Sequence, residues 1–170
     1  MQRPQAQEYN NTLYAHYESL MPEGNMMANL QTVHQASQLL LRDLSEEKAN
    51  FAYEAGKWTI KQVIQHLIDT ERIMAYRALC IGRGEKTALP GFDQNMYAYN
   101  ANVSNVSLQQ LLGEWHLLRL TTIQLFARFT EEESQLIGNA NGYPISVRAL
   151  AFLILGHELH HIRILKERYL

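Results

Sequence analysis

Hydrophobic residues recur at steps of three and four positions in four separate stretches of the chain, which is the pattern of amphipathic helices. The four stretches cover residues 25–44, 59–82, 107–129 and 146–170. Thr59, followed three residues later by Gln62, predicts a capping box at the start of the second stretch. Ser146 directly precedes the apolar residues of the fourth stretch, and we expect it to be the N-cap of that helix.

Four helices of about 20 residues in a chain of 170 predict an all-α fold, an up-and-down four-helix bundle with antiparallel packing. The second connection, from Gly82 to Val106, is much longer than the connections usual between neighbouring helices of a bundle. A long loop in a compact domain usually has a function or covers part of the protein. We therefore expect a long second crossover loop that covers something.

Two further segments have a predicted structure. Residues 1–24 contain several tyrosines and leucines and are too apolar for a free tail, so we expect a leader with a short helix packed on the bundle. The bundle domain itself is predicted to span residues 25–170. Asn141-Gly142 within residues 137–145 favours a small β-hairpin, because this dipeptide suits a two-residue turn.

Composition and charge exclude several classes of protein. The chain is 46% hydrophobic and 19% charged, and its net charge of −2 gives no basic field for nucleic acid or an anionic membrane. The longest apolar run, residues 149–155, is far shorter than the ~20 residues that span a bilayer. Cys80 is the single cysteine and the first residues contain no apolar signal, so we expect a reduced, cytoplasmic protein.

Three of the seven histidines, His157, His160 and His161, fall within five positions near the end of the chain. Residues four apart lie on one face of a helix, so His157 and His161 direct two imidazoles toward one point. On a helical wheel they lie about 80° and about 40° from the centre of the apolar stripe, whereas His160 lies about 140° away. Because imidazole is the commonest side-chain ligand of zinc, nickel and similar ions, this pair predicts a metal site. His160 is expected to face solvent or a neighbour.

The segment from His157 to His161 also matches the H-E-x-x-H pattern of zinc proteases, in which the glutamate is the general base. We reject this interpretation because those enzymes usually find their third ligand downstream. The nine residues after His161 include no histidine, aspartate or cysteine. Glu158 lies about 20° from the stripe centre, so it is predicted to point into the packed core rather than over a cleft.

A third ligand is expected upstream, where the candidates are His16, His34, His66 and His116. His66 lies about 120° from the centre of its own apolar stripe, which is a poor direction for an inward ligand. In its favour, Asp69 follows three residues later and can orient the imidazole by a hydrogen bond. Periodicity alone leaves His66 only slightly ahead of His34 and His116.

Three charged residues, Glu71, Arg119 and Glu158, fall at the centres of apolar stripes on three different helices. A buried charge needs a partner of opposite sign. We therefore predict that Arg119 bridges the two carboxylates across the core. The alternative is that the helices are rotated and one or more of these groups reach solvent.

Three segments of the chain, taken in order, carry a family resemblance: GKWTIKQVIQHLIDTER at 56–72, PGFDQ at 90–94 and GHELHH at 156–161. Together they resemble the DinB-like superfamily, which includes the YfiT type of metal-dependent hydrolase. The resemblance covers roughly residues 25–170. Any one of the three segments alone would be weak, whereas their combination in this order is specific.

The resemblance implies a four-helix bundle with a long second crossover and one divalent metal ion, usually zinc or nickel. Carried over to this sequence, the implied ligands are His66, His157 and His161, and this choice settles the third ligand. The resemblance also implies a homodimer. Relatives include thiol S-transferases that use bacillithiol or mycothiol, and a mycothiol-dependent isomerase.

Three neutral imidazoles on a divalent ion leave at least one coordination position open. Such a position can lower the pKa of a bound water to about 7, or bind and deprotonate a thiol. Cys80 lies about 21 Å along the helix from His66, which argues against a closed structural site. We predict a metal-dependent hydrolase or thiol S-transferase acting on a small molecule. The alternatives are a non-catalytic, stress-type metal-binding protein and structural histidines that bind no metal.

The long second connection contains residues with two competing interpretations. Asp93, Tyr97 and Tyr99 are candidates to line the mouth of the metal site and to contact the substrate. The alternative is that Phe92 and Tyr97 cap the end of the bundle. The sequence leaves the two interpretations equal.

Overall fold

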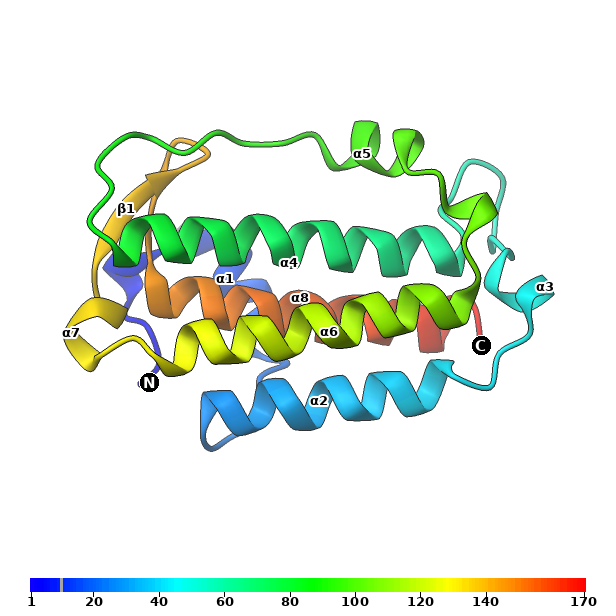
Figure 1. The fold of residues 1–170 in the computed structure, drawn as a ribbon, viewed down its shortest axis with the longest axis horizontal. Helices are drawn as coiled ribbons and strands as arrows, with labels where there is room; N and C mark the ends of the chain where they lie inside the picture. The colour runs from blue at the N-terminus through cyan, green and yellow to red at the C-terminus, as the bar shows by residue number, and fades with distance from the viewer. Residues whose placement is uncertain (10) are drawn as a thin grey trace.

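The computed structural model describes residues 1–9 and 11–170, with the side chains of residues 11–14 outside the description. Four long helices run side by side and form a bundle (Figure 1). They are α2 (Met26–Leu41), α4 (Ile60–Gly82), α6 (Leu108–Ala127) and α8 (Val147–Arg168). The predicted all-α four-helix bundle is therefore confirmed, although α2 and α6 end two or three residues before the expected positions.

Short elements fill the leader and the connections. A 3₁₀ turn and a short helix precede the bundle, and three further short helices and a second 3₁₀ turn lie between the long helices. These elements are η1 (Ala6–Glu8), α1 (Asn11–Glu18), α3 (Glu46–Ala49), α5 (Gln94–Asn100), η2 (Val103–Asn105) and α7 (Glu131–Ser134). Two strands, β1 (Ile137–Ala140) and β2 (Tyr143–Ser146), pair antiparallel just before α8.

The helix starts follow from the side chains that cap them. The Thr59 hydroxyl accepts a hydrogen bond from the Gln62 backbone N–H over 3.2 Å, and the Gln62 side chain accepts one from the Thr59 backbone N–H over 2.9 Å. Ser146 Oγ accepts from the backbone N–H of Ala149 over 3.0 Å. Both caps satisfy backbone donors that have no partner within the helix, and both predictions are confirmed.

The second connection determines the direction of the third long helix. It starts at one end of the bundle and returns along the whole length of α4, through α5, before α6 begins (Figure 1). As a result α6 runs parallel to α4. Two contacts show the same direction, because Arg72 pairs with Glu114 near the middle of both helices and Gly82 packs against Phe129 at their ends. The predicted long crossover is confirmed. The expected up-and-down order holds at the first and third connections but not at the second, because the crossover returns the chain to the end of the bundle where α4 began.

The hairpin before α8 turns at Asn141 and Gly142, whose φ values are 56° and 82°. Two positive φ values suit a two-residue hairpin turn, and glycine adopts such a value without strain. The hairpin expected from the Asn-Gly dipeptide is confirmed. Leu89 in the second connection donates its backbone N–H to the Asn139 carbonyl over 2.9 Å, so the long loop is tied to the hairpin.

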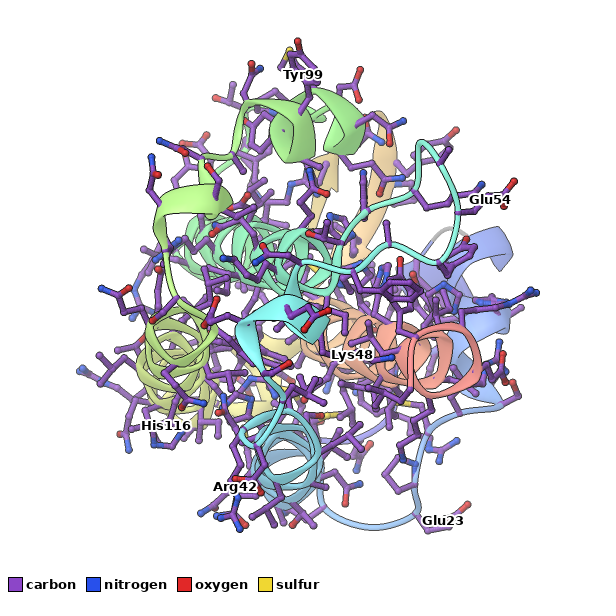
Figure 2. All side chains as sticks on the ribbon, turned by 90° about the vertical axis from the view of Figure 1, so that its right-hand side faces the viewer. Glu23, Arg42, Lys48, Glu54, Tyr99 and His116 are labelled. Carbon is purple, nitrogen blue, oxygen red and sulfur yellow. The ribbon has the colours of Figure 1, made fainter. Side chains whose placement is uncertain are left out.

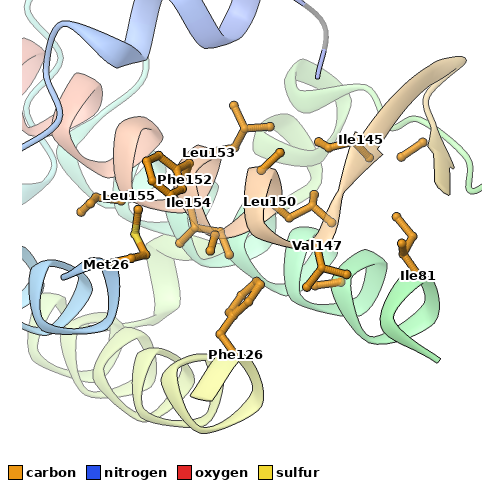
Figure 3. Close-up of a cluster of buried hydrophobic side chains, with 14 of the residues drawn as sticks. Met26, Ile81, Phe126, Ile145, Val147, Leu150, Phe152, Leu153, Ile154 and Leu155 are labelled. Atoms are coloured by element: carbon orange, nitrogen blue, oxygen red, sulfur yellow. The ribbon is translucent and has the colours of Figure 1, made fainter. Parts of the chain in front are cut away.

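Helix α8 is the most deeply buried element of the bundle. Every residue from Val147 to Glu158 is buried, because α1, α2 and α4 all pack against this helix. One cluster of apolar side chains surrounds its first half, including Phe126 of α6 and Ile81 of α4 (Figure 3). A second cluster, around Trp115, surrounds its second half. No helix in the described part of the chain is long and apolar enough to cross a membrane.

The leader lies on α8 and is held there by an ion pair and by close packing. The buried guanidinium of Arg148 donates to both carboxylate oxygens of Glu8, and Ser146 Oγ donates to one of them over 2.7 Å. Tyr17 packs directly over Gly156, where a Cβ atom would lie 2.5 Å from the Tyr17 Cβ. The division of the chain into a leader and a domain at residue 25 stays a prediction.

Candidate metal centre

The structure brings together the three histidines on which the sequence analysis converged. The Nε2 atoms of His66 and His157 lie 2.9 Å apart, and candidate ligand atoms of His66, His157 and His161 all lie within 4.8 Å of one another. In the described part of the chain this is the single cluster of three or more histidine, cysteine, aspartate or glutamate side chains with such spacing. Cys80 is not part of it.

Two helices position these side chains. His157 and His161 are one turn apart on the same face of α8, and their ring centroids are 4.5 Å apart. His66 approaches from α4, which packs antiparallel to α8 and has more contact with it than any other helix. The wheel argument for the α8 pair is therefore correct. The helical wheel gave His66 too low a rank, because α4 is buried on a face that is broader than its apolar stripe. The His66 side chain is only 5% exposed.

Burial determines the charge state of the three rings. Burial lowers the pKa of His66 to about 4 and, together with neighbouring histidines, lowers the pKa of His161 to about 3. The pKa of His157 lies well below its ordinary value, again chiefly because of burial. The rings are therefore neutral at neutral pH, which is the form in which imidazole binds a metal.

The three rings lie close enough together to share one divalent cation. Two nitrogen ligands at bond lengths of roughly 2.0–2.1 Å are about 2.9 Å apart at a right angle and about 3.4 Å apart at the tetrahedral angle usual for zinc. The Nε2 atoms of His66 and His157 are 2.9 Å apart, at the short end of this range. Three neutral imidazoles lie together with no carboxylate or cationic side chain in the cluster, and imidazole is a ligand that suits zinc and nickel.

The partner of His66 differs from the predicted one. Asp69 accepts a hydrogen bond from the Gln65 side chain over 2.9 Å and pairs with Arg72 at 4.0 Å, so its expected role in orienting His66 was wrong. Nδ1 of His66 faces the Thr70 hydroxyl at 3.5 Å instead. Both i+3 and i+4 positions neighbour a residue on a helix, but here the carboxylate at i+3 is engaged by Gln65 and Arg72.

The other candidate histidines lie elsewhere. His160 faces a neighbour, as expected: its Nδ1 lies 3.0 Å from Nε2 of His16, which is exposed. His34 belongs to α2 and is buried against α8, where its Nδ1 lies 3.8 Å from Oε1 of Glu158. His116 stacks on His34 with ring centroids 5.6 Å apart, at the outer side of α6 (Figure 2).

The predicted charge bridge is confirmed. Arg119 donates from Nε and Nη2 to the two carboxylate oxygens of Glu71 over 2.8 and 2.7 Å, and from Nη1 to Glu158 over 2.6 Å. All three side chains are almost completely buried. Glu158 therefore points into the core and away from the histidine cluster, which removes it as the general base of a protease-type site.

A cavity of about 280 Å³ opens beside the histidines, and His66 and His157 form part of its wall. The rest of the wall comes from the leader, α4, the second connection, the hairpin and α8. Most of it is apolar or aromatic, including Tyr17, Met74 and Leu153. The sequence analysis missed the contribution of the leader and the hairpin, although the apolar character of residues 1–24 was a signal that they pack on the bundle.

The prediction that Asp93, Tyr97 and Tyr99 line the mouth of the metal site is wrong, and the aromatic residue of the second connection that reaches the cavity is Phe92. Phe92 lines the cavity, with Tyr97 packed against it at a centroid distance of 5.3 Å. Asp93 caps α5 by accepting from the backbone N–H groups of Asn95 and Met96. Tyr99 is 87% exposed and points away from the bundle (Figure 2). Asp93, Tyr97 and Tyr99 are therefore not among the residues that line the cavity.

Comparisons with known proteins bear on the family and the fold of this chain. A family model described as the DinB superfamily matches residues 29–165. A protein from Oceanobacillus iheyensis named "Putative metal-dependent hydrolase" is 26% identical over 128 residues, which cover 74% of this chain and 73% of the relative. A protein of the same name from Geobacillus thermodenitrificans is 24% identical over 139 residues, which cover 79% of this chain and 77% of that relative.

A solved structure has the same fold. YfiT from Bacillus subtilis, described as "a probable metal-dependent hydrolase with an unusual four-helix bundle topology", is similar with a TM-score of 0.76 and 16% sequence identity. The match covers 98% of this chain and 90% of YfiT. At this identity the likeness concerns the fold alone. It confirms the bundle expected from the periodicity of the sequence.

Proposed function

Because this chain belongs to the DinB superfamily, we propose that it is a metal-dependent enzyme that acts on a small molecule. The proposed ligands of the metal are His66, His157 and His161, and the proposed ion is zinc or nickel. The proposed reaction is hydrolysis. The names of the two relatives support it, since both are called metal-dependent hydrolases.

One observation carries the proposal: three neutral imidazoles converge at the wall of a cavity that is large enough for a ligand. A structural zinc site is usually closed by four protein ligands, whereas a catalytic site keeps one position for water or substrate. Here the described residues supply three, and two of them, His66 and His157, also line the cavity. The chemistry that a bound ion supplies at such a site is Lewis acidity, which lowers the pKa of a coordinated water or thiol.

The protein residues have separate roles in this proposal. The three histidines bind the ion, and the Thr70 hydroxyl, 3.5 Å from His66 Nδ1, helps to orient that ring. Apolar cavity residues such as Met74 and Leu153 hold the substrate and exclude bulk water. Arg119 fixes α4 and α8 relative to each other through Glu71 and Glu158, and so keeps the histidines of the two helices aligned.

A second candidate function is transfer of a group to a low-molecular-weight thiol. The observation that favours it is the chemistry of the cavity wall, which includes no aspartate or glutamate among the described residues. Hydrolytic water usually needs a general base in addition to a metal. A thiol has an ordinary pKa of about 8.5, so coordination to a metal ion needs to lower the pKa only modestly to give the nucleophilic thiolate near neutral pH, without a carboxylate base.

Metal analysis followed by turnover assays tests the proposal. We expect about one zinc or nickel ion per chain, and turnover of esters, amides or thiol-plus-electrophile pairs that is lost in His66→Ala. A charge-transfer band that grows when thiols are titrated into the cobalt-substituted protein would favour the transferase. A metal-loaded protein without turnover on the whole panel would instead favour a non-catalytic metal-binding protein of the stress type. Protein that binds no metal would refute the proposal.

The family resemblance also supports a homodimer, and we propose that the protein forms one. We further propose that it lies in the cytoplasm and has no nucleic-acid or membrane partner. Exposed leucines on α2 and α6 provide apolar surface for a subunit contact: Leu39 is 58%, Leu117 66% and Leu120 44% exposed. Light scattering of the purified protein checks the subunit number. A mass of one chain at micromolar concentration would contradict the dimer.

A further inference from the structure

Arg77 is a buried cation in the wall of the cavity beside the histidine cluster. Its side chain is only 8% exposed, and it is the single residue with a full charge among the described cavity residues. Burial lowers the pKa of its guanidinium, which nevertheless stays protonated at neutral pH because arginine has so high an ordinary pKa. The cavity therefore carries a fixed positive charge in addition to any metal ion.

This charge has no carboxylate partner among the described residues. The one hydrogen bond recorded for the guanidinium runs from Nη2 to the backbone carbonyl oxygen of Pro90, over 2.6 Å. Residues 10–14, whose side chains lie outside the description, contain no aspartate or glutamate. By contrast, the two other deeply buried guanidiniums, Arg119 and Arg148, each pair with glutamates. A buried cation without a counterion is costly, so its position requires a reason.

The position of Arg77 along α4 separates it from the histidines. His66, Thr70, Met74 and Arg77 follow one another at helical spacing and all line the cavity. The Cα atoms of His66 and Arg77 are roughly 16 Å apart along the helix axis. The guanidinium lies beside the second connection, where its Nη2 donates to the Pro90 carbonyl oxygen over 2.6 Å. A ligand that touches both ends must therefore be elongated.

We propose that Arg77 binds the carboxylate of an elongated, largely apolar small molecule whose reactive end lies at the histidine cluster. This inference rests on the proposed function, since it takes the cavity as the substrate pocket of the metal centre. A carboxylate would supply the missing counterion and accept two parallel hydrogen bonds from the guanidinium. Apolar residues between the two ends, such as Met74 and Leu153, suit a hydrocarbon segment.

The charge balance favours a carboxylate over a phosphate. One guanidinium, with part of its donor capacity taken by Pro90, balances a single negative charge. A dianionic phosphate would need further cations or a cluster of backbone donors, and the described cavity wall contains no lysine or second arginine. Arg77 could have a purely structural role if it only held the second connection through Pro90. A neutral hydrogen-bond donor would serve that role, so it does not explain a buried charge.

Calorimetric titration of octanoate, its uncharged counterpart octanamide and octyl phosphate into the whole 170-residue chain tests the inference. Titrations are run on both zinc-free and zinc-loaded protein, because a carboxylate can also bind a metal directly. The variants are Arg77→Gln and Arg77→Met, with Arg72→Gln as the matched control. Arg72 lies on the same helix but is exposed and pairs with Glu114 outside the cavity. Circular dichroism and zinc content establish that each variant is folded and loaded.

We expect octanoate to bind wild-type protein at least about tenfold more tightly than octanamide, with or without zinc. Arg77→Gln and Arg77→Met should lose about that factor for octanoate only, and Arg72→Gln should behave as wild type. Three results would overturn the inference: equal affinities of the two compounds for the wild type, unchanged octanoate binding in the Arg77 variants, or tighter binding of octyl phosphate. The wild-type comparison remains decisive even if the variants do not fold.

The two proposals fail in different ways in this experiment. Octanoate binding that depends on Arg77 in a protein that takes up no zinc would support the anion site and contradict the metal centre. Normal zinc uptake with no role for Arg77 in octanoate binding would contradict the anion site and leave the metal centre standing.

Discussion

The Nε2 atoms of His66 and His157 lie 2.9 Å apart although 91 positions separate the two residues in the chain. Both rings are neutral at neutral pH because burial lowers their pKa values, so each keeps one nitrogen lone pair. A candidate ligand atom of His161 lies within 4.8 Å of those of both rings. The proposed metal centre depends on this relationship between α4 and α8.

Alanine substitution of the three clustered histidines should abolish metal binding. Loss of any one imidazole leaves two protein ligands, and two are too few to hold zinc or nickel against dilution. We expect the metal content of His66→Ala, His157→Ala and His161→Ala to fall from about one ion per chain to near zero. Elemental analysis after gel filtration measures this directly.

His160→Ala is the matched control for these variants, because it removes an imidazole from the same helix. Its ring nitrogen Nδ1 faces His16 rather than the cluster, so its removal should largely spare metal binding. Equal loss of metal in His160→Ala and His161→Ala would show that the two faces of α8 are not distinguished as the structure indicates.

The stability of the metal-free protein should fall as the pH decreases from about 6.5 toward 4. The folded-state pKa values of His66 and His161 are about 4 and about 3, below the unfolded value of about 6.5. In this window the unfolded state binds more protons than the folded state, so the free energy of unfolding decreases with falling pH. Each such histidine contributes a slope of about 1.4 kcal/mol per pH unit.

Urea unfolding of wild type and His161→Gln, at several pH values after chelation, measures the effect of one ring. The variant lacks one titrating group, so its stability should depend less steeply on pH between about 6 and 4. His34, whose pKa is also lowered to about 3, is unchanged in both proteins and cancels in the comparison. Identical slopes in the two proteins would mean that His161 titrates normally in the folded state.

Arg119→Met should be strongly destabilising. The substitution leaves the carboxylates of Glu71 and Glu158 buried without their cation, and breaking a buried ion pair in this way typically costs about 3–5 kcal/mol. Glu71 keeps one hydrogen bond from the Trp115 indole N–H, at 3.3 Å, which cannot replace two charged ones. Equilibrium unfolding in urea at pH 7.5 provides the free energy.

Neutralising the carboxylates in the same background provides the control. Adding Glu71→Gln and Glu158→Gln to Arg119→Met removes both buried charges and should recover a substantial part of the lost stability. If the triple variant is no more stable than Arg119→Met, the loss comes from packing around the arginine side chain rather than from unpaired charge.

Local sequence rules predicted the elements and contacts that depend on helix periodicity. Thr59 and Ser146 marked helix starts because their side chains cap the nearest backbone N–H groups. The spacing of four between His157 and His161 placed both rings on one face, and a stripe-centred Arg119 required buried carboxylates. Each of these inferences rests only on the regular geometry of a helix and on the free-energy cost of burying a polar group without a partner.

Features that depend on how separate segments meet could not be predicted in the same way. The helical wheel ranked His66 low because it treats burial as one stripe, whereas α8, α6 and the second connection surround α4. The cavity joins a tyrosine of the leader to Arg77 of α4, and nothing local in the sequence links them. Asp69 was assigned to His66 from spacing alone, but its carboxylate turns to Gln65.

Gly156→Ala should destabilise the protein even though alanine is the better helix former. A Cβ at this position would lie 2.5 Å from Cβ and 2.9 Å from Cγ of Tyr17, so α1 would have to move away from α8. Overpacking of this kind typically costs about 1–3 kcal/mol, which exceeds the gain of roughly 0.5–1 kcal/mol from replacing a helical glycine. The shift would also widen the cavity, because Tyr17 forms part of its wall.

Gly113→Ala isolates the helix-propensity effect, since a Cβ at this exposed position of α6 would have no atom within 4 Å. There the same substitution should raise the free energy of unfolding by roughly 0.5–1 kcal/mol. Urea unfolding of the two variants should therefore give changes of opposite sign. Stabilisation by both substitutions would mean that α1 does not pack on α8 at Tyr17 in solution, and that the leader does not close this side of the cavity.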